Sequence, residues 1–206
     1  MNAINSAAPP RARKVQMDMA TEPKSAYHHG DLRAALLGHA ADMLESGENF
    51  SMRALAKRAG VSNAAPYRHF DDREALESAV ALEGFQDLRA QLASLPTPPS
   101  DPTDLAEFGV IYVRFALAHP ARFKLMFGRE CDDRDDERVR AAGALNDLLT
   151  SAVAADFPDS DAPALATAAW ALAHGLAFLH LDGKLDNHDP TTIDARVRTS
   201  FAAILT

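Results

Sequence analysis

The segment 51–76, SMRALAKRAGVSNAAPYRHFDDREAL, restricts the fold more than any other part of the chain. Ser51 is a good N-cap, and the apolar residues behind it recur at steps of three and four along one helix face: Met52, Leu55, Ala56 and Ala59. Gly60 tolerates the positive φ of a tight helix end, and Ser62 is placed to cap a second helix. The segment therefore predicts two short helices joined by a sharp turn, the layout of a helix-turn-helix.

The second helix is expected over residues 63–69, where polar side chains alternate with alanines that keep it slim enough for the major groove of DNA. Pro66 removes one amide donor, but the donors of a first helical turn are mostly unpaired anyway. Beyond it, Asp71 and Glu74 predict a D-x-x-E capping box, with Arg73 in the first turn of a long helix. A DNA-reading helix followed directly by a long helix is the expectation.

The stretch GVSNAAPYRHFDDREAL resembles the end of the DNA-binding domain in the TetR/AcrR family of transcription regulators. The similarity extends back through YHHGDLRAALLGHAADMLESG, an amphipathic helix that Gly47 closes, and covers about residues 27–95. It implies an all-α protein with an N-terminal three-helix helix-turn-helix domain and a C-terminal helical ligand-binding and dimerisation domain. Further along, AWALAHGLAFLHLDGKL resembles the Trp-x-x-x-His-Gly (WHG) signature of one C-terminal subfamily, carried by Trp170, His174 and Gly175.

The expected domain organisation follows from these segments. Residues 1–24, rich in Ala, Pro and basic side chains, are predicted to be a disordered arm that adds phosphate contacts, with a solvated tail of no function as the alternative. Residues 25–72 form the DNA-binding domain, and residues 73–95 a connecting helix. PTPPSDP, residues 96–102, is a linker, and residues 103–206 form the ligand-binding and dimerisation domain.

The DNA contacts are predicted by residue type. Asn63 suits a bidentate contact to adenine, whereas Ser62 is expected at a phosphate and Ala64 at a thymine methyl. The remaining predicted contacts go to phosphates: Ser51, Arg53, Tyr67, His69 and Arg73, with Lys57 as a weaker candidate. Tyr67 is ambiguous, because its ring is equally suited to packing under the reading helix.

The second half predicts a packing surface and an aromatic cavity. Small residues dominate 161–181, and the last helix, about 191–205, carries one apolar stripe, so the last two helices are expected to form a homodimer interface. The predicted ligand-binding residues are Phe108, Tyr112, Phe115, Phe123, Met126, Phe127, Trp170, His174 and Phe178. They suit a hydrophobic or aromatic small molecule, and the alternative is an ordinary core in which His174 is a structural histidine.

Composition limits the remaining classes. The net charge is −8, but residues 1–90 carry 11 Lys and Arg against 12 Asp and Glu, so the acidity lies in the second half and a basic DNA-binding face is possible. The single cysteine, Cys131, argues against a disulfide framework, and the arginine-interrupted acidic run around it against a metal site. No 18-residue apolar run or secretion signal is expected, which predicts a cytoplasmic protein without a membrane partner.

The predicted function is that of a sequence-specific transcriptional regulator that binds double-stranded DNA. The resemblance implies that a small-molecule effector releases it from a palindromic operator, with repression as the commoner output in this family and activation as the alternative. An all-α enzyme is the remote alternative, because no catalytic set, phosphate loop or metal-ligand spacing occurs and no cofactor is expected. The stronger alternative is a ligand-independent DNA-binding or protein-interaction module on the same fold.

Overall fold

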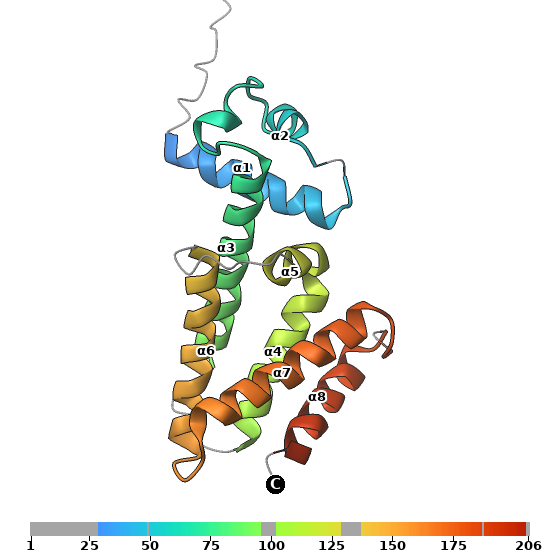
Figure 1. Ribbon diagram of the computed structural model, residues 1–206. Helices are drawn as coiled ribbons and strands as arrows, with labels where there is room; N and C mark the ends of the chain where they lie inside the picture. The colour runs from blue at the N-terminus through green and yellow to red at the C-terminus, as the bar shows by residue number, and fades with distance from the viewer. Residues whose placement is uncertain (1–28, 49, 96–101, 129–136, 187, 205–206) are drawn as a thin grey trace, which may run out of the picture.

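The computed structural model describes residues 29–48, 50–95, 102–128, 137–186 and 188–204, and every element in them is helical. The first domain contains α1 (His29–Glu45), α2 (Met52–Arg58), the short 3-10 helix η1 (Pro66–Arg68) and the start of α3 (Arg73–Ala93). In Figure 1, α1 lies across the upper part of α3, with α2 beside it. Their apolar faces enclose a small core: Leu36, Leu37, Ala40, Met43, Phe50, Met52, Leu55, Phe70, Leu76 and Val80. The all-α prediction is confirmed.

The turn after α2 has the predicted glycine geometry. The Ser51 hydroxyl oxygen accepts a hydrogen bond from the amide of Ala54 at 3.2 Å and caps the helix start. At the other end Gly60 has a φ of 68°, and the Val61 amide donates to the carbonyl of Ala56 at 3.0 Å. This bond closes the helix end as a Schellman motif, in which only glycine is free of strain.

The reading helix differs from the prediction. Residues 63–65 form a turn, and only Pro66–Arg68 is helical, in 3-10 geometry. The physical reason is Pro66, which has no amide to donate to the Ser62 carbonyl; Ala65 donates to that carbonyl instead, at 2.9 Å. The predicted Ser62 cap was also wrong, because η1 has no side-chain cap.

The long helix also begins one residue from the predicted cap. Asp72, not Asp71, is the N-cap of α3, and its carboxylate accepts from the amide of Ala75 at 2.8 Å. Both aspartates are able to cap a helix. In the structure, Asp72 has the extended backbone of an N-cap, and Arg73 is the first residue of the helix.

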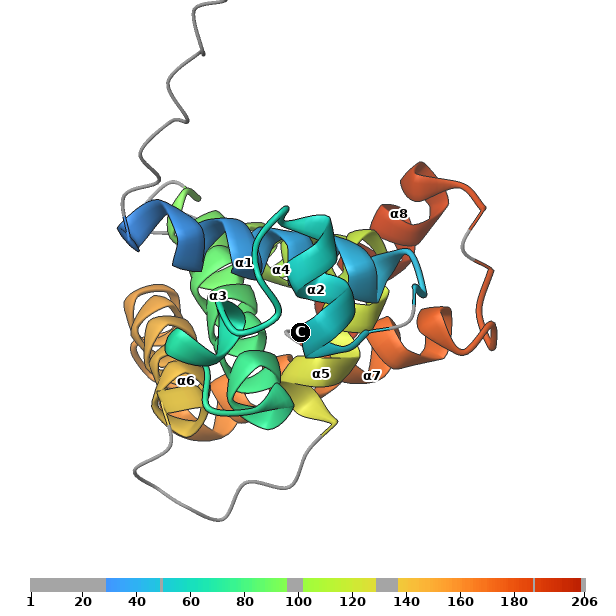
Figure 2. The same cartoon turned by 90° about the horizontal axis from the view of Figure 1, so that it is seen from above.

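The second domain packs α4 (Pro102–Ala118), α5 (Pro120–Phe127), α6 (Glu137–Asp156), α7 (Ala162–Leu181) and α8 (Pro190–Ile204) against the lower part of α3. α6 runs beside α3, and α7 crosses the bundle diagonally (Figure 1). Seen from above, α7 runs from beneath α6 toward the right of the view, where its end and α8 lie (Figure 2). The predicted arm, the linker up to residue 101 and Cys131 lie outside the described residues.

The expectation that the chain contains no 18-residue apolar run was wrong. α7 is long and apolar enough, with a mean hydropathy of 1.4, to meet the length and composition requirements of a membrane span. Core helices of globular proteins meet the same requirements. α7 contacts α4, α6 and α8, and the share of its most apolar stretch buried inside the chain is 33%. Its larger apolar residues outside that share are partly buried against the core, whereas Ala164, Ala168, Ala171 and Leu179 are exposed.

Candidate DNA-binding face and effector cavity

The turn before η1 presents the predicted base-reading residues to solvent. Ser62, Asn63 and Ala64 are all exposed. Tyr67 is 54% exposed, which makes it the most exposed large hydrophobic side chain among the described residues. The Tyr67 ring therefore lies on the surface and is not packed in the core under the reading helix.

Beside this turn lies a shallow hollow lined by Ser51, Arg53, Ala54, Lys57 and Asn63. Arg53 and Lys57 are exposed, and no ion pair joins either of them to another described residue. The Ser51 hydroxyl oxygen accepts the capping bond, and its proton is still available to be donated outward. The hollow thus combines two free cations, a hydroxyl and an amide, the donors that phosphates bind.

Other cations of the domain are partly occupied. Arg58 donates to both carboxylate oxygens of Glu48, at 2.9 and 3.0 Å. Arg73 donates to Glu77 at 2.6 Å and lies 5.2 Å from the centre of the Phe50 ring. These partners compete with a phosphate for the Arg73 guanidinium.

The exposure of two residues, His69 and Arg68, does not match the phosphate contacts that were predicted from the sequence. The ring of His69 is half-buried and lies 6.5 Å from that of Phe70, so it is less available than predicted. Arg68 was not predicted, yet it is exposed at the end of η1, without an ion pair to a described residue. Its position beside Tyr67 was the signal that could have identified it.

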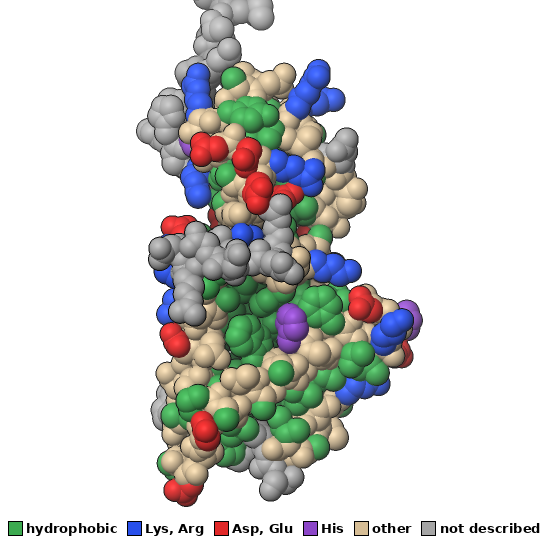
Figure 3. All heavy atoms as spheres, viewed as in Figure 1, with side chains coloured by type: hydrophobic (Ala, Val, Ile, Leu, Met, Phe, Trp, Pro, Cys, Tyr) green, Lys and Arg blue, Asp and Glu red, His purple; other side chains and the backbone are tan. Residues whose placement is uncertain are grey.

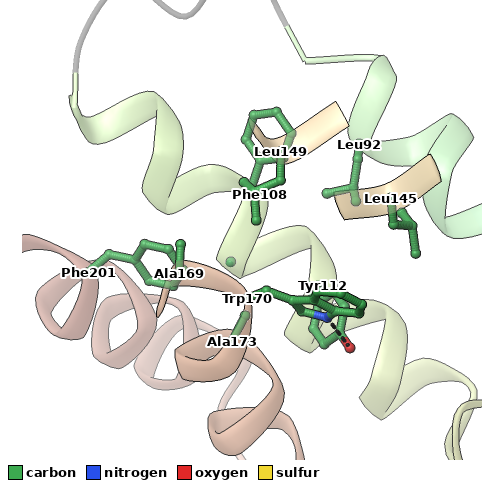
Figure 4. A pocket seen from close by; sticks show the side chains of 10 residues that line it. Leu92, Phe108, Tyr112, Leu145, Leu149, Ala169, Trp170, Ala173 and Phe201 are labelled. Carbon is green, nitrogen blue, oxygen red and sulfur yellow. Dashed lines mark hydrogen bonds between the residues drawn. The ribbon is translucent and has the colours of Figure 1, made fainter. Parts of the chain in front are cut away.

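Inside the second domain, a small cavity of about 30 Å³ lies between α3, α4, α6, α7 and α8. That volume holds one or two water molecules at most. Three predicted ligand residues line it, namely Phe108, Tyr112 and Trp170 (Figure 4). Sequence reasoning missed the other lining residues: Leu92, Gly109, Leu145, Leu149, Ala169, Ala173 and Phe201. They come from separate helices, and no pattern along the chain joins them.

The other predicted ligand-binding residues do not line this cavity, and four of them form a cluster beside it. Phe123, Phe127 and Phe178 surround His174, with ring centres 5.8, 4.8 and 4.8 Å from the imidazole, and form an aromatic cluster next to the cavity. In Figure 3, hydrophobic side chains gather in a hollow between α5 and α7.

Phe115 and Met126 belong to neither the cavity lining nor this cluster. Phe115 is buried beneath the Arg122 guanidinium, 5.3 Å from its ring centre, and Met126 is buried among core side chains. Both are core residues in this structure, not cavity residues.

A chain of hydrogen bonds joins the cavity to the aromatic cluster. The Trp170 indole N–H donates to the Tyr112 hydroxyl oxygen at 3.1 Å (Figure 4), and that hydroxyl lies 2.8 Å from His174 Nδ1. The Tyr112 proton has one acceptor left, so His174 Nδ1 is unprotonated in a fully paired network. Burial raises the pKa of Tyr112 and lowers the pKa of His174, which favours these neutral forms.

His180 is a second unusual histidine. Its side chain is fully buried in α7, and neither ring nitrogen has a hydrogen-bond partner among the described residues. Burial lowers its pKa, and Arg196 adds to that effect. Among the described residues, no group of three or more His, Cys, Asp and Glu side chains converges in a way that suits a metal ion.

Comparison with known proteins gives matches over both domains. Residues 46–80 match the bacterial regulatory proteins of the tetR family, and residues 105–204 match the tetracyclin repressor-like C-terminal domain. Among the curated proteins, none matches the chain.

Several solved structures are similar over most of the chain. A protein of unknown function from Rhodococcus sp. RHA1 is 33% identical, with a TM-score of 0.73 over 86% of this chain and 96% of its own. A TetR-family transcriptional regulator from Pectobacterium atrosepticum is 17% identical, with a TM-score of 0.67 over 86% of this chain and 93% of its own. A TetR/AcrR-family regulator from Thermobifida fusca is 14% identical, with a TM-score of 0.65 over 83% and 96%. The last two share the fold.

Proposed function

Because the chain belongs to the TetR family of DNA-binding transcriptional regulators, we propose that it is a cytoplasmic homodimeric repressor which a small uncharged ligand releases from a palindromic operator. The observation that carries this proposal is the exposed turn of residues 62–64 before η1, the reading turn. Ser62, Asn63 and Ala64 are exposed, and the side chains of Ser62 and Asn63 make no hydrogen bond to another described residue. In this proposal Asn63 reads a base, while Ser62, Arg53 and Lys57 hold phosphates.

Exposed small side chains on α7 and α8 support the dimer. On α7 the exposed positions include Ala164, Ala168, Ala171, Gly175 and Leu179, which recur at steps of three and four. The solvent side of α8 carries Ala195, Thr199, Ala202 and Ile204. Such small residues let a second pair of helices approach closely, and Figure 3 shows mostly uncharged side chains on this face. A four-helix contact between two chains would cover it.

The cavity lining indicates the chemistry of the ligand. Every lining residue is apolar except for Trp170 and Tyr112, whose polar groups are already paired with each other. A charged ligand would be buried there without a counter-charge, at a large cost in free energy. An apolar or aromatic neutral molecule is therefore the expected effector, and side chains must move to admit it because the cavity is so small.

The small cavity also favours a second candidate function, a ligand-independent DNA-binding or protein-interaction module. Thermal denaturation separates the two functions, since a ligand that binds only the folded state raises the melting temperature. We would measure it with a panel of neutral aromatic compounds and their carboxylated analogues. Stabilisation by neutral members alone supports the effector proposal. No stabilisation by any member, or preference for the carboxylated analogues, contradicts it.

DNA recognition is tested by selecting duplexes from a random-sequence library with the purified protein. A palindromic winner, bound at least about 10³-fold more tightly than scrambled DNA, is the expected result. Affinity should be compared at two salt concentrations, because phosphate contacts make it fall steeply with salt. A winner without two-fold symmetry would contradict the dimeric reading of two half-sites.

A further inference from the structure

α5 is the element at which the two domains meet. Leu125 packs against the cores of both domains. Figure 1 shows α5 below α1 and above α7. A Cβ atom placed on Gly84 of α3 would lie 2.6 Å from the sulfur of Met126, so α3 and α5 approach each other closely. Any rotation of the first domain against the second must therefore move α5 or slide across it.

Glu45, the last residue of α1, is bound to the N-terminus of α5. One carboxylate oxygen accepts from the amide of Ala121 at 3.0 Å, and the other from the amide of Arg122 at 2.9 Å. These are first-turn amides, which have no partner within their own helix. His119, the N-cap residue of α5, makes no side-chain cap bond. The carboxylate of Glu45 thus takes the place of the missing cap, from 76 residues away.

An ion pair connects α5 to α3. The Arg122 guanidinium donates to Asp87 at 2.7 Å, and its central carbon, Cζ, lies 5.3 Å from the centre of the Phe115 ring. The side chain of Arg122 is only 11% exposed, whereas that of Asp87 is 54% exposed, so solvent reaches this pair from the side of Asp87 and screens it. Together Glu45 and Arg122 hold α5 against α1 and α3.

The opposite face of α5 belongs to the aromatic cluster. Phe123 lies 5.4 Å from the Tyr112 ring, and Phe127 lies 4.8 Å from His174 and 6.4 Å from Trp170. One eight-residue helix therefore contacts the side chains beside the cavity and, one turn away, carries the amides that Glu45 binds.

We propose that Glu45 is a positioning residue, which fixes the angle of the helix-turn-helix domain on α5 and so the spacing of the two reading turns in the dimer. Two half-sites one helical turn apart are read together only if that spacing is held, and one base pair changes it by about 3.4 Å. The bidentate contact restricts rotation about the end of α1 more than a single bond would. This proposal rests on the dimer proposed above.

The test uses the full-length protein, its selected operator and two variants. Glu45→Gln keeps one acceptor oxygen and loses the bidentate charged contact. Asp42→Asn removes the same charge from an exposed position of α1 one turn earlier, where the carboxylate lies 3.7 Å from Arg58 of α2 and makes no hydrogen bond to the described residues of α5. The measurement is the ratio of affinities for the natural operator and for operators with one base pair inserted or deleted between the half-sites.

Glu45→Gln should lower this ratio at least about fivefold, the lower end of ordinary coupling effects, while Asp42→Asn leaves it unchanged. Binding to a duplex with one half-site should stay the same in both variants, because neither touches the reading turn. A defect confined to folding would weaken all duplexes alike. Equal spacing ratios in Glu45→Gln and Asp42→Asn would overturn the proposal.

Hydrogen exchange tests the contact without DNA and without a variant. In the wild-type protein, the amides of Ala121 and Arg122 should exchange at least about tenfold more slowly than those of Asn63 and Ala64 in the exposed turn. Exchange as fast as in that turn would show that Glu45 does not hold α5, and would overturn the proposal. If the selection yields no palindrome, the dimer proposal fails, and this measurement still decides whether the Glu45 contact exists.

Discussion

Gly109 in α4 packs directly against Phe201 of α8, and replacing it with alanine tests the packing of the cavity wall. A Cβ atom there would lie 2.7 Å from Cζ and 3.0 Å from Cδ2 of Phe201, whose buried ring would have to shift. Overpacking of this kind costs about 1–3 kcal/mol. The same substitution gains about 1 kcal/mol in helix propensity, so Gly109→Ala should be destabilising by about 0–2 kcal/mol.

Gly143 in α6 provides the matched control. It is exposed, and a Cβ atom there would meet nothing within 4 Å. Gly143→Ala therefore gains the propensity without the overpacking and should be stabilising by about 0.5–1 kcal/mol. The difference between the two variants isolates the overpacking of about 1–3 kcal/mol. In thermal denaturation at equal protein concentration, that is a separation of at least about 2 °C for a chain of this size.

Phe201→Ala completes the cycle. It should cost about 3–5 kcal/mol, and it removes the ring that the new methyl group would meet. In that background Gly109→Ala should become stabilising, as Gly143→Ala is. The reasoning is refuted if Gly109→Ala stabilises the otherwise unchanged protein as much as Gly143→Ala does, or if its effect adds to that of Phe201→Ala within about 0.5 kcal/mol.

Four other outcomes are expected. Asn63→Ala should cost about 1–3 kcal/mol on the selected operator and less on scrambled DNA; equal losses would exclude base reading. Arg53→Ala should weaken binding to both duplexes alike and reduce the salt slope by about one, as measured by titration at several salt concentrations. Tyr112→Phe leaves an indole N–H without its acceptor and should cost about 1–3 kcal/mol in urea denaturation, whereas no loss would contradict the network. Because the folded state lowers the pKa of His174 and His180, the unfolded state binds more protons, so the melting temperature should fall as pH drops below about 6.5. His180→Leu should reduce this pH dependence, and an unchanged dependence would contradict the role of burial.

Local features of the first domain were predictable from the sequence because they depend on neighbouring residues. Gly60 was placed correctly, since a helix end with positive φ needs a residue without a Cβ. Ser51 was placed correctly as a cap for the same local reason. The errors at Asp71 and Pro66 are also local: two adjacent aspartates compete for one cap, and one missing amide decides between α and 3-10 geometry.

Long-range contacts could not be predicted in this way. That Trp170 and His174 share a helix face follows from their spacing, but their common partner Tyr112 lies 58 and 62 residues away. The same holds for Phe201 against Gly109.

The sequence by itself determined most of the helices, the sharp turn after α2 and the family, because capping, turn geometry and apolar periodicity act over a few residues. Only the tertiary structure decided how small the cavity is and that Glu45 caps α5. Both depend on how separate helices pack, and packing is set by the sum of many weak contacts between residues distant in sequence.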